Sequence, residues 1–249
     1  MDIPDPSRFD SAAGYLRLIH PVPVAFVMLG TAIFGLLAAG GTPAPGRFAL
    51  MLLAMLGGQV ALGAHNELCD REHDARHQPE KPIPAGLVRP ESVPPIVAGG
   101  LLAALAAGWA LGPWPLALLA LGTGSGFVYN LWLKRTPLSG IPYLIALPLL
   151  PIWTWLVMDA FEPRLLWLYP LGGSYVLAIH LAQSLSDVEG DRASGARGLA
   201  VMLGRARTRR LIWAIALATA LLMPPGALLL GERPIYGALA GAAVLVVLG

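Results

Sequence analysis

Three oxygen-bearing side chains follow one another at four-residue intervals in the segment NELCDREHDARHQPEKPIPAG, residues 66–86. They are Asn66, Asp70 and Asp74. If a helix continues through them, this spacing places all three on one face. Carboxylates four residues apart on a helix repel each other unless a cation offsets their charge. Such oxygens suit a hard cation, and Mg²⁺ is typically held by one or two carboxylates, water and substrate phosphates.

A second segment, LAQSLSDVEGDRASGARG, repeats the spacing with Gln183, Asp187 and Asp191. Two such stripes at one depth, on two helices, would provide the ligands for two Mg²⁺ ions bridged by a diphosphate. Paired metal ions of this kind offset the charge that develops as the diphosphate leaves. The two segments together therefore predict a two-metal diphosphate site.

Cationic side chains accompany both stripes. Lys81 follows the first stripe, Lys134 lies in YNLWLKR between the two, and Arg192 belongs to the second segment. A diphosphate carries about three negative charges, so cations and metals together are the means of holding it. Tyr129 and Asn130, which begin YNLWLKR, indicate by themselves only an aromatic residue at a membrane interface and its neighbour.

The chain around these charges is strongly apolar. Of its 249 residues, 56% are hydrophobic and 13% are charged, against roughly 25% charged residues in soluble domains. Runs of about 20 apolar residues recur, each long enough to cross a hydrocarbon core of about 30 Å. The runs do not alternate with period two, so we expect helices and not a barrel. The sequence predicts an all-α integral membrane protein and contains no nucleic-acid motif.

Proline, glycine and charged residues divide the chain into eight expected spans. They lie near residues 22–40, 47–65, 93–111, 115–133, 139–158, 165–185, 209–230 and 234–249. The two long charged linkers and the basic linker near 134–138 all follow even-numbered spans, which places them on one side of the membrane. The last span is short and ends abruptly, which fits a truncated chain or a missing further span.

The Lys and Arg residues are distributed unequally between the two sides. Fourteen of the seventeen lie on the side that holds the N-terminus and the charged linkers. Because cytoplasmic loops carry an excess of Lys and Arg, we expect the N-terminus and the active-site loops in the cytoplasm. We expect this multi-pass protein in a bacterial cytoplasmic membrane, in contact with membrane lipids.

Four segments resemble the UbiA superfamily of intramembrane prenyltransferases, in the expected order along nearly the whole chain. The segment from Asn66 resembles its first aspartate-rich motif, Asn-x-x-x-Asp-x-x-x-Asp with a basic-Pro tail. SDVEGDRASGARGLAVMLG resembles its second aspartate motif, YNLWLKR its tyrosine–lysine motif, and YLRLIHPVPVAFVMLGTAIFG its first span. The chain departs from the usual pattern at Glu67, often Asp, at Lys81, usually Arg, and at His20, often a basic residue.

The resemblance implies a single domain over residues 1–249, a bundle of about eight to nine transmembrane helices around a central cavity open to the bilayer. It implies two Mg²⁺ ions that bind a polyprenyl diphosphate, whose allylic cation alkylates an aromatic, chlorin or lipid-alcohol acceptor. The metal ligands it implies are Asn66, Asp70, Asp74, Asp187 and Asp191. The diphosphate ligands it implies are Asn66, Lys81, Lys134 and Arg192. The four aspartates would be catalytic, and Tyr129 would lie near the reacting carbon.

Three alternatives remain open at this point. An enzyme of the same fold could cyclise a prenyl diphosphate without any acceptor. An ion-coupled transporter would carry acids near the bilayer midplane, but the centres of these spans lack them. CDP-alcohol phosphotransferases also use Asp-rich membrane motifs, but their Asp-Gly…Ala-Arg signature is absent around Asp70. Among prenyltransferases, HQPEKPIPAG and DVEGDR favour the chlorophyll-synthase and glyceryl-lipid branches over the 4-hydroxybenzoate branch.

Overall fold

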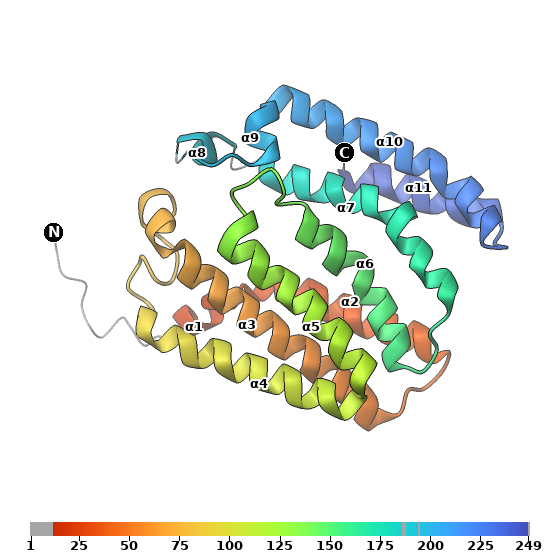
Figure 1. Cartoon of the computed structure of the whole chain (residues 1–249), viewed down its shortest axis with the longest axis horizontal. Helices are drawn as coiled ribbons and strands as arrows, with labels where there is room; N and C mark the ends of the chain where they lie inside the picture. Colours follow the sequence, from red (N-terminus) through yellow and green to blue (C-terminus); the bar gives the residue numbers. More distant parts are fainter. Residues whose placement is uncertain (1–11, 186–187, 194, 249) are drawn as a thin grey trace. The chain divides into compact units, whose positions relative to one another are not determined.

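A computed structural model describes residues 12–185, 188–193 and 195–248, and the regular elements in these residues are helices (Figure 1). The described chain divides into two compact units, one of residues up to 131 with 150–161, the other of 132–149 and 162 onward. Each unit is built from apolar helices, which confirms the all-helical fold class expected from the sequence.

The first unit is formed by five helices in chain order, with part of a sixth. They are α1 (Ala12–Leu18), α2 (Pro21–Ala39), α3 (Pro45–His77), α4 (Val93–Leu111), α5 (Pro113–Val128) and the end of α6 (Ile141–Val157). A short 3₁₀ turn, η2 (Pro90–Ser92), precedes α4, and a π-helical turn, η3 (Tyr129–Leu133), continues α5. Helix α3 packs against α1, α2, α4 and α5, so it is the central helix of this unit.

The second unit is formed by the start of α6 and by five later helices. They are α7 (Leu168–Leu185), α8 (Val188–Ala193), α9 (Leu199–Leu203), α10 (Arg205–Leu229) and α11 (Pro234–Leu248). Helix α10 packs along α11 and α7, as Figure 1 shows for these three neighbouring helices. The short helices α8 and α9 pack on each other, and α8 carries part of the second acidic segment.

Six helical segments of the described chain are long and apolar enough to cross a membrane. They are residues 21–39, 45–77, 90–111, 113–133, 163–185 and 205–229. Two shorter apolar helices, residues 141–157 and 234–245, lie where the fifth and eighth spans were expected. Apolar helices therefore lie at all eight expected positions, and six of them are long enough to be membrane spans, whereas the other two are shorter than a hydrocarbon core of about 30 Å ordinarily requires.

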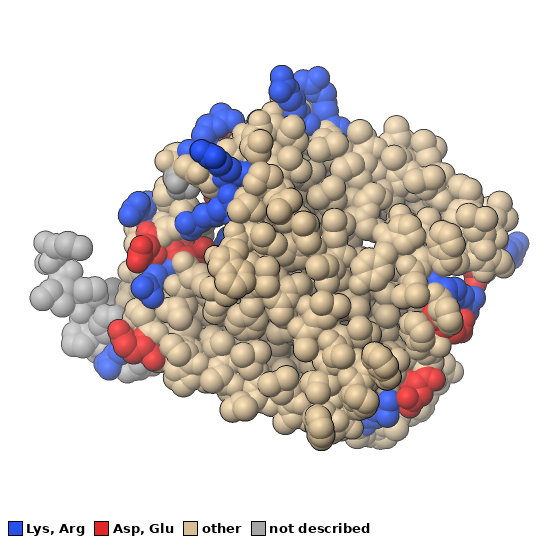
Figure 2. Space-filling view, viewed as in Figure 1, with Lys and Arg blue, Asp and Glu red and all other residues tan. Residues whose placement is uncertain are grey.

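The sides of these helices expose large apolar side chains. Phe26, Trp109, Trp114 and Leu229 are each between 71% and 77% exposed. Figure 2 shows that Lys, Arg, Asp and Glu gather toward the ends of the helices, while their sides are covered mainly by uncharged residues. Soluble proteins rarely expose apolar surface on this scale. Lipid chains are the surroundings in which such a surface is stable, as expected of an integral membrane protein.

Small residues allow α3 and α4 to pack closely. A Cβ atom added at Gly57 would lie 2.6 Å from the Gly100 carbonyl oxygen, and one added at Gly100 would lie 2.7 Å from the Gly57 oxygen. Ala61 and Ala104 lie beside this contact. Helices in lipid gain little from burying apolar surface, so close contact between small residues is a main source of their association.

We predict that Gly100→Ala destabilises the protein, whereas Gly99→Ala does not. Gly99 has no neighbour within 4 Å of an added Cβ, so the matched substitution only improves helix propensity there. Overpacking of a tight contact typically costs about 1–3 kcal/mol. Thermal unfolding in detergent should show a lower midpoint for Gly100→Ala alone, and equal midpoints would contradict the close α3–α4 contact.

Candidate active site

Helix α3 continues well beyond its apolar part. It begins at Pro45 and ends at His77, where the Gln78 amide still donates to the Asp74 carbonyl oxygen at 2.8 Å. Pro79 then follows, and the residue before a proline is disfavoured in a helix. The condition for a single polar stripe is therefore met, and Asn66, Asp70 and Asp74 lie on one face of α3.

Three carboxylates are buried at this end of α3. The residues are Glu67, Asp70 and Asp74, with exposed fractions of 1%, 5% and 2%. Burying an ionised carboxylate is costly unless it is paired and hydrogen-bonded. Glu67 was noted in the sequence only as a departure from a motif, although its spacing of three and seven residues from the aspartates is also helical. The structure adds it to the candidate site.

Lys81 provides a positive charge for two of these carboxylates. Its Nζ lies 2.8 Å from Asp74 Oδ2 and 3.2 Å from Glu67 Oε1. Burial alone would lower the pKa of Lys81, but the hydrogen bond to Asp74 and the charges of Glu67 and Asp74 outweigh it and raise the pKa. A raised lysine pKa stabilises the fold at neutral pH, and this contribution is lost only as the pH rises through the folded-state pKa.

The loop that carries Lys81 is fixed at both ends of its turn. Arg17 of α1 donates from Nη2 to the Glu80 carbonyl oxygen at 2.7 Å, and the Ala85 amide donates to the Lys81 carbonyl oxygen at 2.8 Å. Gly86 then adopts a φ of 69°, in the left-handed region that glycine tolerates best. These contacts bring the loop back over the end of α3, so that Lys81 reaches the buried carboxylates.

His20 reaches Glu67 from another element, the turn between α1 and α2. Its Nε2 lies 3.1 Å from Glu67 Oε1, and its own backbone is left-handed, with φ 54° and ψ 69°. A non-glycine residue held there costs of order 1–3 kcal/mol. Gly63 permits the approach, because an added Cβ would lie 2.8 Å from the Ile19 carbonyl oxygen.

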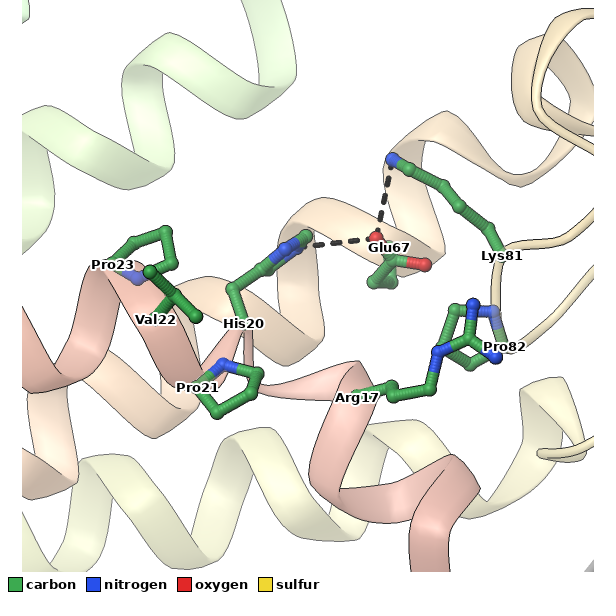
Figure 3. Close-up of a pocket in the computed structure, with 8 residues that line it drawn as sticks. All are labelled: Arg17, His20, Pro21, Val22, Pro23, Glu67, Lys81 and Pro82. Atoms are coloured by element: carbon green, nitrogen blue, oxygen red, sulfur yellow. Dashed lines mark ion pairs between the residues drawn. The ribbon is translucent and has the colours of Figure 1, made fainter.

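Figure 3 shows His20 and Lys81 meeting on one oxygen of Glu67. The three residues line a pocket of about 270 Å³, whose other lining residues are Arg17, Pro21, Val22, Pro23 and Pro82. His20, noted in the sequence only as a departure from the family pattern, therefore lies in a polar cluster with Glu67 and Lys81. Glu67 Oε2 is buried and has no hydrogen-bond partner among the described residues.

Asn66 is held by Asn130, a residue that is not among the predicted site residues. Its Nδ2 donates to Asp70 Oδ2 and to Asn130 Oδ1, both at 3.1 Å. Asn130 lies in η3, directly after Tyr129, and is 64 positions away from Asn66. No local pattern in the sequence indicates this contact, because it depends on how α5 packs along α3.

The remaining expected site residues fall in both units. Tyr129 begins η3 in the first unit, whereas Lys134, Gln183, Asp191 and Arg192 belong to the second. The last residue of α7 is Leu185 and the first of α8 is Val188, so Gln183 and Asp191 belong to separate helices. Arg192 Nη2 donates to the Val201 carbonyl oxygen at 3.2 Å. Asp187 lies outside the described residues, and its expected role stays a prediction.

The donor set of the first segment fits Mg²⁺ chemically. It offers carboxylate and amide oxygens, and Asp74 already attracts the Lys81 ammonium group to 2.8 Å. Hard divalent cations prefer such oxygen ligands. Among the described residues, which exclude Asp187, no group of three or more His, Cys, Asp and Glu side chains is arranged to hold a metal by itself.

An all-helical membrane protein with buried carboxylates and a lysine at one helix end has the features of an intramembrane enzyme for a charged, lipid-linked substrate. Comparison with known proteins identifies the class. The model of the UbiA prenyltransferase family matches residues 27–249. The chain therefore belongs to the UbiA prenyltransferase family, which confirms the resemblance and the predicted enzyme class.

Individual relatives agree with this assignment. The chain is 30% identical over 218 residues to digeranylgeranylglyceryl phosphate synthase of Methanopyrus kandleri, covering 84% of this chain and 77% of that protein. It is 33% identical over 207 residues to the bacteriochlorophyll synthase 33 kDa chain of Cereibacter sphaeroides, covering 76% and 66%. The structure of a UbiA homologue from Archaeoglobus fulgidus bound to GPP and Mg²⁺ is similar in fold, with a TM-score of 0.81 at 19% identity, covering 94% and 86%.

We predict that Glu67→Gln destabilises the fold more than Glu72→Gln on the same helix. Glu67 is paired with Lys81 and His20, whereas the Glu72 side chain is 82% exposed. Loss of a buried charged acceptor typically costs about 1–3 kcal/mol. Lys81 retains its ion pair with Asp74 in this variant. In a chain of this size each kcal/mol shifts the unfolding midpoint by about 2–4 °C. Unfolding in detergent measures both variants, and a wild-type midpoint for Glu67→Gln would contradict the stabilising role of the cluster.

Proposed function

We propose that this chain transfers a prenyl group from a polyprenyl diphosphate to an acceptor, in a reaction that depends on Mg²⁺. The observation that carries the proposal is the buried carboxylate face of α3, with Lys81 against it, in a member of the prenyltransferase family. The bond between the prenyl carbon and the diphosphate oxygen breaks, the prenyl carbon bonds to the acceptor, the acceptor loses a proton, and diphosphate leaves.

In this proposal two Mg²⁺ ions would be held by Asn66, Asp70 and Asp74 of the first acidic segment and by Asp187 and Asp191 of the second. When bound, the ions supply charge neutralisation for the departing diphosphate. The solved structure of the Archaeoglobus fulgidus homologue contains GPP and Mg²⁺, which supports the choice of metal and of substrate class. Lys134 and Arg192 would bind diphosphate oxygens, and Tyr129 would face the reacting carbon.

Lys81 has a distinct role in the proposal. Its ammonium group now lies on Asp74 Oδ2, an oxygen that a metal ion would need. With a metal ion held by Asp74, Lys81 would be free to bind an oxygen of the diphosphate. Glu67 would limit the movement of Lys81, because its Oε1 lies 3.2 Å from Lys81 Nζ. The other oxygen of Glu67 is buried without a partner among the described residues.

The surroundings of the site suit the reaction. A polyprenyl tail is stable among lipid chains, whereas a diphosphate requires cations, and the end of a membrane-spanning helix can serve both. The allylic cation formed on ionisation must be kept from water, which would convert it to an alcohol. By the distribution of Lys and Arg, we place this end of the bundle on the cytoplasmic side of a bacterial membrane.

The names of the two relatives support a lipid alcohol or a chlorin as the acceptor. One relative is a digeranylgeranylglyceryl phosphate synthase, and the other is a bacteriochlorophyll synthase chain. The test is mass spectrometry of the products formed by membranes given labelled prenyl diphosphates of several lengths, with and without each acceptor. A prenylated acceptor supports transfer, whereas a cyclic hydrocarbon formed equally without acceptor would replace it with cyclisation.

We predict that Asp70→Ala or Asp187→Ala abolishes turnover while the protein stays folded in detergent. Each substitution removes a proposed metal ligand and with it several kcal/mol of transition-state stabilisation. Product formation at matched expression is the measurement, and Glu72→Ala, at an exposed position on α3, is the control that should stay active. Full activity in either aspartate variant would exclude its role as an essential ligand.

We predict that turnover requires Mg²⁺ or Mn²⁺ and stops when a chelator is in excess. The proposed ligands are oxygens, which bind hard cations in preference to soft ones. Activity should return when Mg²⁺ is added beyond the chelator, which separates metal removal from damage to the protein. Undiminished product in excess chelator would count decisively against the metal-dependent mechanism.

A further inference from the structure

Asn130 is connected to the polar end of α3 by three polar contacts. Its Oδ1 accepts from Asn66 Nδ2 at 3.1 Å, and its Nδ2 lies 3.3 Å from both the Leu62 carbonyl oxygen and His65 Nδ1. All these partners belong to α3, whereas Asn130 belongs to η3 at the end of α5. Single π-helical turns of this kind occur frequently at functional sites.

The Leu62 carbonyl oxygen determines which atoms donate and which accept in these hydrogen bonds. The Leu62 carbonyl oxygen can only accept, so the side chain of Asn130 must present its Nδ2 to that oxygen. Its Oδ1 is then turned toward Asn66, which must present Nδ2 in return. The same constraint makes His65 Nδ1 an acceptor, because the Asn130 amide nitrogen offers only protons.

The consequence is a fixed orientation of the Asn66 amide group. Its Nδ2 donates to Asn130 Oδ1 and to Asp70 Oδ2, so both of its N–H groups are used within the protein. The atom left to bind a cation is Oδ1, the oxygen that a hard metal requires. Without Asn130, the amide would be oriented only by its hydrogen bond to Asp70, which is itself a proposed metal ligand.

We infer that Asn130 is a positioning residue for the metal site. The hydrogen bond to the Leu62 carbonyl oxygen fixes the orientation of the Asn130 amide, and Asn130 in turn orients the Asn66 amide so that its Oδ1 faces the cation. The inference rests on the proposed function, which makes Asn66 a metal ligand. Removal of a group that hydrogen-bonds to a metal ligand and orients it typically lowers metal affinity 10–100-fold. Asn130 itself touches neither metal nor substrate in this account.

The test measures Mn²⁺ binding to the detergent-solubilised full chain by electron paramagnetic resonance, with inorganic diphosphate at a fixed concentration. Asn130→Ala should weaken Mn²⁺ binding about tenfold. Leu131→Ala, in the same π-helical turn and 50% exposed, is the matched control and should bind as the wild type does. Equal affinity in Asn130→Ala and the wild type would overturn the inference.

A double-mutant cycle separates positioning from a merely structural role. In an Asn66→Asp background the ligand has only oxygens, so its orientation no longer depends on Asn130, and Asn130→Ala should change affinity less than about twofold. An equal tenfold loss in both backgrounds would show that Asn130 acts through the fold alone. Such a result would overturn the inference and leave the proposed function intact.

Asn130→Asp keeps the test decisive if Asn130→Ala does not fold. Its carboxylate still accepts from Asn66 Nδ2, so Mn²⁺ affinity should stay at or above that of the wild type. A tenfold loss in this variant, with an unchanged unfolding midpoint, would contradict the inference. A wild-type protein that binds no Mn²⁺ in the presence of diphosphate would overturn the metal proposal, and the inference with it.

Discussion

The burial of carboxylates at the end of a membrane-spanning helix is the constraint on which the rest of the first unit depends. Glu67, Asp70 and Asp74 are almost wholly buried, although each carries a charge that apolar surroundings strongly disfavour. The elements near the end of α3 supply polar or charged side chains that reduce the cost of burying these carboxylates. The loop after α3 supplies Lys81, the α1–α2 turn supplies His20, and η3 supplies the Asn130 amide that holds Asn66.

These partners can reach α3 because the backbone around it is shaped by small residues. Gly63 has no side chain, so the Ile19 carbonyl group can lie close to α3 there. The next residue, His20, then reaches Glu67, one helical turn after Gly63. Farther along the same helix, Gly57 meets Gly100 of α4 at a distance that a methyl group would not allow. A helix with this pattern is fixed in position by close backbone contacts, so the polar groups at its end can have fixed distances as well. Packing in the lipid part of the chain thus supports chemistry at the interface.

Periodicity and composition were sufficient to predict the helices and one face of the site. The spacing of Asn66, Asp70 and Asp74 predicted a polar stripe, and α3 does continue through all three. The same periodicity contained Glu67, but an isolated motif position gave no reason to expect it buried against Lys81 and His20. Asn130 and His20 could not be predicted, because their contacts join residues 64 and 47 positions apart through helix packing and a left-handed turn. Local sequence patterns fix which face a side chain occupies, whereas tertiary packing decides what it meets there.

The choice of an amide at position 66 follows from the charge already present. Three buried carboxylates lie on this part of α3, and the single charge of Lys81 offsets only part of theirs. A fourth carboxylate at position 66 would add repulsion at the four-residue spacing to Asp70. Asn66 provides an oxygen without a charge, and its N–H group donates to Asp70 and stabilises that carboxylate. An amide, however, can point either end at a cation, so its orientation depends on neighbours that can only accept from it. Asp70 is one such acceptor, but it is itself a proposed metal ligand. The Asn130 amide is hydrogen-bonded to the Leu62 carbonyl oxygen, so its own oxygen is fixed as a second acceptor for Asn66. The contact between Asn130 and Leu62 therefore helps to orient the Asn66 amide.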